Sequence, residues 1–145
     1  MINTDNIIQI VTAFCGTLGF GILFNIKGKK LFLAALGGMI SCLLFLILGA
    51  IIQGEILRSF IVAALLTLYS EILARKVKTP AATFCIVSLI PLIPGSNLYY
   101  TMSYALSGKT EDFFAKAAHT LGLAAALSLG IIVVTALSRF AFKKK

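Results

Sequence analysis

The stretch that decides the fold of this chain reads Ile86-Val87-Ser88-Leu89-Ile90-Pro91-Leu92-Ile93-Pro94-Gly95-Ser96-Asn97-Leu98-Tyr99-Tyr100. It lies inside a longer apolar segment and carries two prolines three residues apart. Proline has no amide donor, and its ring clashes with the carbonyl four residues earlier. Pro91 therefore frees the carbonyl of Val87, and Pro94 frees that of Ile90. The sequence predicts a helix that is interrupted at these prolines.

The residues after the prolines predict that a second helix follows. Gly95 permits a sharp change of backbone direction, and Ser96 or Asn97 is a good N-cap for a helix that runs through Tyr104. A helix broken in this way offers carbonyls from its first half, which suit an ammonium group. The second half offers amides and a positive dipole end, which suit a carboxylate. The alternative is a plain proline kink whose backbone groups are satisfied by neighbouring helices.

The composition places the whole chain in a membrane. Of its 145 residues, 59% are hydrophobic and only 12% are charged, and the mean hydropathy is +1.01. These values exclude a soluble enzyme, a nucleic-acid-binding module and a disordered tail. Because no alternating pattern typical of a β-barrel appears, we expect an all-α membrane protein with a single integral membrane domain over residues 1–145. The predicted bundle of five transmembrane helices spans about 7–26, 31–53, 56–74, 81–106 (broken near 91–96) and 117–138.

Most of the basic residues fall in three segments that five spans would place on one side of the membrane. These segments are Lys27–Lys30, Arg75–Lys78 and the C-terminal end from Arg139 to Lys145. The positive-inside rule then predicts an outside N-terminus and a cytoplasmic C-terminus. At a rise of about 1.5 Å per residue, the break lies about 15 Å from Ala81, close to the bilayer midplane. Helices broken at that depth often line the substrate site of a transporter.

Two motif regions, in this order and spacing, resemble one known family. The first is Gly19-Phe20-Gly21-Ile22-Leu23-Phe24-Asn25, followed by a basic turn and by Leu31 to Gly37-Gly38; the second is Pro91-x-x-Pro94-Gly95 with Tyr99 or Tyr100 and Ser107-Gly108. Over nearly its whole length, the chain resembles the small membrane subunit of the bacterial threonine/serine exporter family. The resemblance implies export of small hydroxy amino acids, or of dicarboxylates such as succinate, driven by the proton motive force. It also implies a larger membrane subunit as partner and a place in the bacterial cytoplasmic (inner) membrane.

The leading interpretation is therefore a subunit of a secondary exporter, and not an enzyme. In this interpretation the substrate carboxylate meets the amides near Ser96 and Asn97, while Tyr99 and Tyr100 line the route. The predicted substrate-binding residues are Pro91, Pro94, Gly95, Ser96, Asn97, Tyr99 and Tyr100. We expect no catalytic residues and no cofactor. We expect no metal site, because Cys15, Cys42 and Cys85 lie far apart, and no nucleic acid, because the chain has no Trp and few aromatic residues among its basic runs.

Two side chains are candidates for carrying the coupling proton. Glu71 is an acid within a predicted span, although an ion pair with Arg75 one turn later also explains it. His119 lies near the outer start of the last span, where it could relay protons or simply form a hydrogen bond. Arg58, near the outer end of the third span, is expected to reach water, beside Glu55, and is a weaker candidate for contact with an anionic substrate.

Two other functions remain open. One is a non-transporting assembly or channel-type subunit, in which the break merely packs. The spacing of Gly122, Ala126 and Gly130 favours close helix approach and fits packing against a partner. The other, more remote, is an intramembrane hydrolase with Ser96 as nucleophile and His119 as base, although no acid is evident to orient the histidine.

Overall fold

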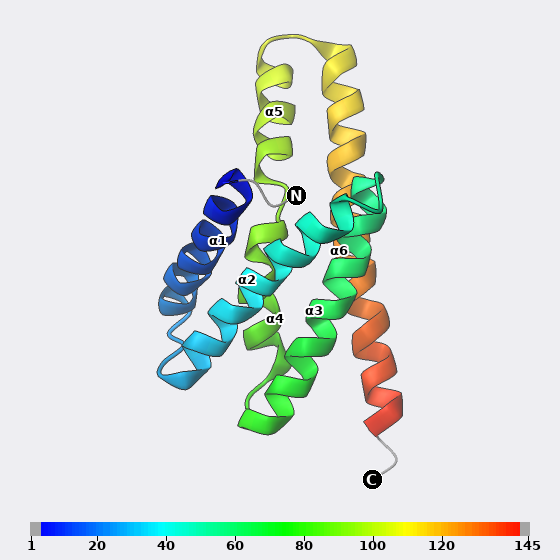
Figure 1. Cartoon of the computed structure of the whole chain (residues 1–145). Helices are drawn as coiled ribbons and strands as arrows, with labels where there is room; N and C mark the ends of the chain where they lie inside the picture. Colours follow the sequence, from blue (N-terminus) through cyan, green and yellow to red (C-terminus); the bar gives the residue numbers. More distant parts are fainter. Residues whose placement is uncertain (1–3, 143–145) are drawn as a thin grey trace.

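The computed structural model describes the backbone of residues 4–142 and the side chains of residues 4–140, and every element in this range is helical. Figure 1 shows these elements, which are α1 (Thr4–Leu23), α2 (Lys29–Gly49), α3 (Glu55–Val77), α4 (Ala81–Leu89), the 3₁₀ turn η1 (Ile90–Leu92), α5 (Gly95–Leu106) and α6 (Thr110–Phe142). The expected all-α class is therefore confirmed for the described residues.

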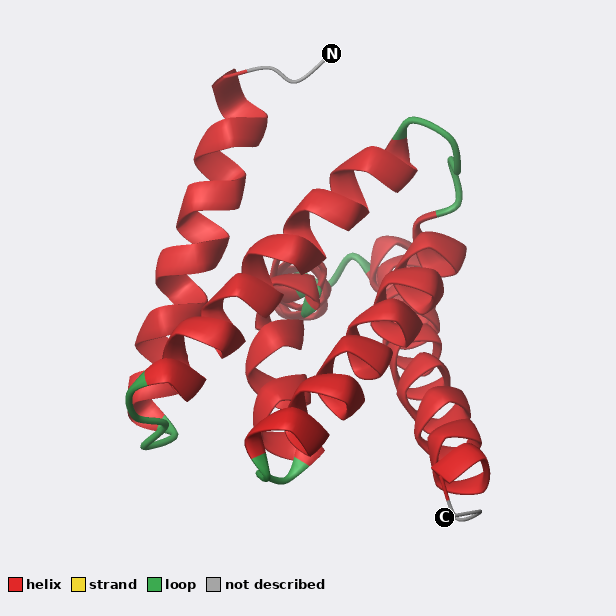
Figure 2. Ribbon diagram, turned by 60° about the horizontal axis from the view of Figure 1, so that its bottom comes forward, coloured by secondary structure: helices red, strands yellow, loops and turns green. Residues whose placement is uncertain are grey.

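The helices run up and down, so that the connections alternate between the two ends of the bundle (Figure 1). The α1–α2 turn, the α3–α4 turn and the last turns of α6 lie at the same end, as both views show (Figure 2). We call this the basic end, because it carries Lys27–Lys30, Arg75–Lys78 and Arg139. In the interior, α3 packs on α6 and α4, and α2 packs on α1, α4 and α3.

Four helices, α1, α2, α3 and α6, are each long and apolar enough to cross a membrane. The pair Ala81–Leu92 and Gly95–Leu106 passes the same test only when its two parts are taken together, and these parts are bent by 58°. The chain is thus a multi-pass membrane protein with four candidate crossings among the described residues, or up to five if the bent pair makes one.

The observed helix ends differ from the expected spans for local reasons. α1 ends at Leu23 because Asn25 adopts a left-handed conformation, φ 58°. The amide of Ile26 then bonds to the carbonyl of Gly21 at 2.9 Å, which closes a Schellman motif. α6 begins at Thr110 rather than near residue 117, and its 33 residues are about 50 Å long. In Figure 1, α5 and the first part of α6 form a hairpin that extends beyond the ends of α1–α3.

Small residues allow the helices to approach one another closely. Gly37 lies against Ser88 of α4, and a methyl group in its place would overlap that side chain. On α6, a methyl group at Gly130 would lie 2.8 Å from the carbonyl oxygen of Phe60 and 3.0 Å from Cβ of Ala63, both on α3. The close helix approach that this spacing favours is therefore confirmed at Gly130, where α6 packs on α3 of the same chain.

Candidate functional site

The connection between α4 and α5 satisfies the carbonyls that the prolines free. α4 ends at Leu89, and the amide of Ile90 bonds to the carbonyl of Val87. The amide of Ile93 bonds to the carbonyl of Ile90 at 3.1 Å. These bonds span three residues instead of four, which is the 3₁₀ geometry of η1. The expectation that these two carbonyls stay free to hold an ammonium group is therefore wrong.

The start of α5, in contrast, leaves its first amides without partners. Its N-cap is Pro94, not Ser96 or Asn97 as expected, and no side chain caps the helix. The amide of Leu98 bonds to the carbonyl of Pro94 at 3.0 Å, which begins the helix earlier than we predicted. Within residues 4–142, the amides of Ser96 and Asn97 have no acceptor. They lie at the positive end of the helix dipole.

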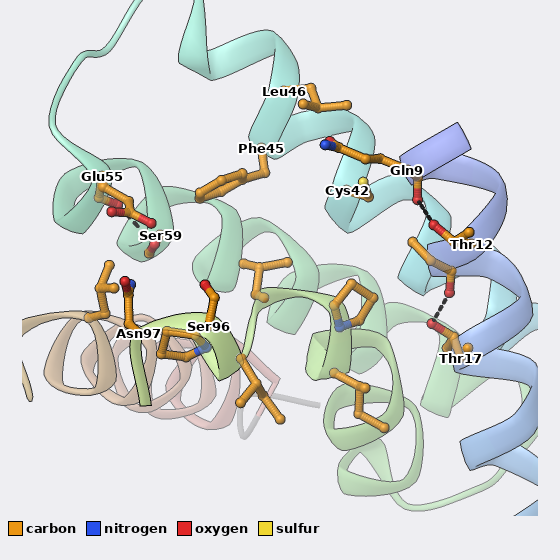
Figure 3. A pocket seen from close by; sticks show the side chains of 18 residues that line it. Gln9, Thr12, Thr17, Cys42, Phe45, Leu46, Glu55, Ser59, Ser96 and Asn97 are labelled. Carbon is orange, nitrogen blue, oxygen red and sulfur yellow. Dashed lines mark hydrogen bonds between the residues drawn. The ribbon is translucent and has the colours of Figure 1, made fainter. Parts of the chain in front are cut away.

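A cavity of about 580 Å³ lies beside this connection, and we call it the break cavity (Figure 3). Its lining comes from five helices and from the connection itself. The residues that line it are Gln9, Thr12, Ala13, Gly16, Thr17, Cys42, Phe45, Leu46, Glu55, Ser59, Ile90, Pro91, Leu92, Ile93, Pro94, Ser96, Asn97 and Leu123. It therefore extends from the first turn of α3 to the middle of α1.

Two polar residues at the start of α5, Ser96 and Asn97, line the break cavity. Asn97 is only 8% exposed, and its side-chain amide has no hydrogen-bond partner in the described part of the chain. Figure 3 shows Ser96 and Asn97 pointing toward the side of the cavity that carries Glu55 and Ser59. Ser59 is already bonded, because its hydroxyl donates to the carbonyl of Glu55 at 2.8 Å. Asn97 therefore keeps both a donor and an acceptor available to a bound molecule.

The structure brings some of the predicted site residues together and separates others. Pro91, Pro94, Ser96 and Asn97 all line the break cavity. Gly95, between Pro94 and Ser96 in the chain, does not line the cavity. A methyl group at Gly95 would meet no atom within 4 Å. Tyr99 and Tyr100 do not line the cavity. They are 69% and 49% exposed on α5 and stack edge to face at 5.5 Å.

The proton-coupling candidates have different surroundings. Nε2 of His119 lies 2.9 Å from Oε2 of Glu55, and Glu55 also lines the break cavity. Glu71 instead pairs with Arg75 at 3.3 Å, on the half of α3 nearer the basic end. The ion pair that we considered for Glu71 is thus present, and His119 is the candidate that is connected to the cavity.

Glu55 is a residue of the site that no sequence pattern predicts. We treated it as a loop residue, but it is the first residue of α3, where an acid is favoured by the helix dipole. Its contact also corrects the statement that no acid orients His119. Ser96, however, makes no hydrogen bond to His119 in the described part of the chain. The Ser–His contact that a hydrolase requires is therefore absent from this structure.

Arg58 is partly exposed, and its guanidinium also makes a contact that we did not expect. Its guanidinium lies over the ring of Phe45, with Cζ 3.9 Å from the centroid. Its Nε is buried and has no hydrogen-bond partner among the described residues. Arg58 thus contacts Phe45, a residue that lines the break cavity.

Comparison with known proteins gives a family for the chain. A family model described as threonine/serine exporter, ThrE, matches residues 9–137. No curated protein and no solved structure matches the chain. The matched residues include every residue that lines the break cavity and nearly all of the described helices. The chain therefore belongs to the threonine/serine exporter ThrE family.

Proposed function

We propose that the chain is one subunit of a proton-driven secondary exporter that moves threonine, serine or a related small carboxylate out of a bacterial cell. The observation that carries this proposal is the pair of unpartnered amides, of Ser96 and Asn97, at the start of α5 beside the break cavity. Backbone amides at a helix N-terminus bind carboxylates without needing a cationic side chain. Membership of an exporter family supports transport rather than hydrolysis.

In this proposal the substrate binds in the break cavity in a defined orientation. Its carboxylate accepts hydrogen bonds from the amides of Ser96 and Asn97, and the dipole of α5 stabilises its charge. The side chain of Asn97 bonds to the substrate hydroxyl. The carboxylate of Glu55, on the opposite side of the cavity, attracts the substrate ammonium group. A volume of about 580 Å³ lies within the usual range of small-molecule sites and accommodates an amino acid with water.

We further propose that α4, η1 and α5 form one interrupted crossing, which gives five spans with the N-terminus outside. A larger membrane subunit would supply the remaining wall of the pathway, since α5 packs chiefly on α6. Rocking of the two subunits against each other would expose the break cavity to one side of the membrane at a time. The chain alone would then bind substrate without transporting it.

The first test is substitution of Asn97 by aspartate. Asn97 is the third residue of α5, where an acidic side chain stabilises a helix. The same charge would repel a substrate carboxylate. With the larger subunit co-expressed, we expect Asn97→Asp to reduce threonine efflux at least about tenfold, equivalent to about 1.4 kcal/mol, while membrane insertion is unchanged.

Tyr99→Phe is the matched control, because Tyr99 lies on the same helix but outside the break cavity. It should export at the normal rate. Normal efflux by Asn97→Asp would remove the substrate site from the break cavity. Absence of efflux from every variant, including the unmodified pair of subunits, would instead favour the assembly-subunit alternative.

Proton coupling is assigned to the contact between His119 and Glu55. His119→Asn keeps a hydrogen-bonding side chain but cannot take up a proton at ordinary pH. We expect efflux by this variant to continue down a substrate gradient and to lose its stimulation by an imposed proton gradient. Glu71→Gln should keep that stimulation, because Glu71 pairs with Arg75 and does not line the break cavity. The reverse pattern would assign the proton to Glu71.

A further inference from the structure

A second cavity lies on the other side of the α4–α5 connection, toward the basic end. It has a volume of about 390 Å³ and is enclosed by α3, α4 and α6. We call it the basic-end cavity. Its polar and charged side chains are Thr67, Ser70, Glu71, Thr135 and Arg139. None of these residues lines the break cavity.

Ser70 is the unusual residue of this cavity. It is completely buried, and its Oγ has no hydrogen-bond partner in the described part of the chain. Ser41 is equally buried, but its hydroxyl donates to the carbonyl of Gly38 at 2.6 Å. Thr67, one turn before Ser70, likewise donates to a carbonyl of its own helix at 2.7 Å. An unsatisfied buried hydroxyl is costly, so its presence in a cavity lining points to a bound polar molecule.

The basic-end cavity also has a positive side. Pro80, Ala81 and Ala82, at the start of the nine-residue helix α4, belong to its lining, and no side chain caps this helix. The amides of Ala81 and Ala82 have no acceptor within residues 4–142. Arg139 enters from α6 and has no ion-pair or hydrogen-bond partner in the described range. Free amides and a guanidinium together favour a carboxylate.

A negative group completes the cavity. The carboxylate of Glu71 is part of the same lining, and Arg75 lies 3.3 Å from it. A carboxylate in the lining attracts an ammonium group and repels a second acid. The combination therefore fits a molecule that carries both charges, and it disfavours a dicarboxylate.

We propose that the basic-end cavity is the site where an α-amino acid first binds from the cytoplasmic side, before it reaches the break cavity. This inference rests on the proposed exporter function. Arg139 and the first amides of α4 hold the carboxylate, Ser70 donates a hydrogen bond to it, and Glu71 receives the ammonium group.

The two cavities are adjacent, and a hydrophobic cluster separates them. Leu89 lines the basic-end cavity, whereas the next residues, Ile90 to Leu92, line the break cavity. Leu89 packs with Val62, Ala63 and Leu66 of α3. α4 and α5 thus each begin beside a cavity, and each presents uncapped amides there. An amino acid would pass from the first set of amides to the second when this cluster opens.

The test compares two buried serines that differ in their hydrogen bonding. Ser70→Ala removes an unpaired hydroxyl, so the ligand-free protein should unfold at the same temperature or higher. The same change should raise the cytoplasmic threonine concentration for half-maximal efflux about tenfold, as expected for a lost hydrogen bond to a charged group. Ser41→Ala removes a satisfied bond outside both cavities, so it should leave this concentration unchanged. Arg139→Gln provides a second variant with the same expected effect as Ser70→Ala.

Direct binding is read from Cys85, which lines the basic-end cavity and is 7% exposed. In a full-length chain in vesicles with Cys15→Ser and Cys42→Ser, L-threonine should slow the modification of Cys85 by methyl methanethiosulfonate, and succinate should not. Ser70→Ala should weaken this protection. No protection by threonine, or equal protection by succinate, would overturn the proposed amino-acid site.

The two proposals fail in different ways. If Asn97→Asp abolishes efflux while Ser70→Ala and Arg139→Gln change neither half-saturation nor Cys85 protection, the basic-end site is wrong and the exporter function stands. If threonine protects Cys85 but no efflux is found with the larger subunit present, the binding site stands and the exporter function is wrong.

Discussion

Asn25 and Lys78 occupy the same backbone position at the ends of two helices. Both are left-handed, with φ 58° and 50°. In each case the next amide bonds back across the turn, from Ile26 to Gly21 at 2.9 Å and from Thr79 to Ala74 at 3.0 Å. Asparagine tolerates this conformation, but lysine does so only at a steric cost. The α3–α4 turn therefore holds local strain that the α1–α2 turn largely avoids.

Glycine at position 78 should relieve that strain. We expect Lys78→Gly to raise the free energy of unfolding by about 1 kcal/mol, measured by reversible denaturation in mixed micelles. Lys76→Gly removes the same charge from the right-handed last turn of α3 and should lower stability by about 1 kcal/mol instead. Equal effects at the two positions would show that charge, rather than backbone conformation, governs this turn.

At the residue scale, the sequence predicted where the helix would break but not how its ends would be satisfied. Two prolines and a glycine are strong local signals, and the change from α4 to α5 falls among them. The position of a helix cap depends on which carbonyl accepts the first hydrogen bond of the helix. In α5 this acceptor is the carbonyl of Pro94, which is bonded by the amide of Leu98. Ser96 and Asn97 therefore lie within the first turn, where their side chains face the break cavity.

Close approach between α3 and α6 depends on small side chains at one face of α6. Besides Gly130, a methyl group at Gly122 would lie 2.9 Å from Cδ1 of Ile56. Ala126 is 5% exposed between them. Gly16 and Gly19 of α1 differ, since a methyl group there would meet nothing within 4 Å. Small residues thus have a packing role in α6 that they do not have at these positions of α1.

Alanine substitution should separate these two cases. Gly130→Ala places Cβ against the backbone of Phe60 and Ala64, which cannot move without separating the helices. We expect it to lower the free energy of unfolding by about 1–3 kcal/mol. Gly19→Ala should be neutral or stabilise by up to about 1 kcal/mol, because alanine is the better helix former. Similar unfolding curves for the two variants would contradict close packing of α3 on α6.

At the element scale, hydropathy predicted the helices well where they are uniformly apolar. It failed at the start of α6, because charged residues precede the apolar run. Glu111 and Asp112 lie in the first turn of α6, where acids stabilise a helix through its dipole. From its charges alone, this stretch is predicted as a connection between spans. The start of α6 is therefore determined by favourable charges in its first turn and not by hydropathy.

At the scale of the whole molecule, contacts between segments that lie far apart in the sequence could not be predicted. Glu55 and His119 are 64 residues apart, and only the packing of α3 on α6 brings them to 2.9 Å. The basic-end cavity likewise combines Ser70, Arg139 and the start of α4. No local pattern marks any of these residues, because each is ordinary within its own helix. The break cavity was predictable only on its α5 side.

The distribution of charge over the whole molecule predicts its orientation. The α1–α2 and α3–α4 turns and Arg139 carry most of the described basic residues and lie at one end of the bundle (Figure 1), whereas the α5–α6 turn at the other end carries Lys109. The end with more basic residues is expected to remain in the cytoplasm. In a chain with its three native cysteines replaced by serine, we introduce either Ser107→Cys, beyond α5, or Thr79→Cys, in the α3–α4 turn. A membrane-impermeant maleimide added to intact cells should label the first variant and not the second.

Permeabilised cells provide the control for this experiment, since both cysteines should then react. Labelling of Thr79→Cys alone in intact cells would place the basic end outside and reverse the assignment of the two cavities. The cavity that contains Arg139 would then face the exterior, and an exported amino acid would reach it last. The orientation of the chain therefore decides whether a solute from the cytoplasm reaches the start of α4 before the start of α5. It also decides which of the two cavities binds that solute first.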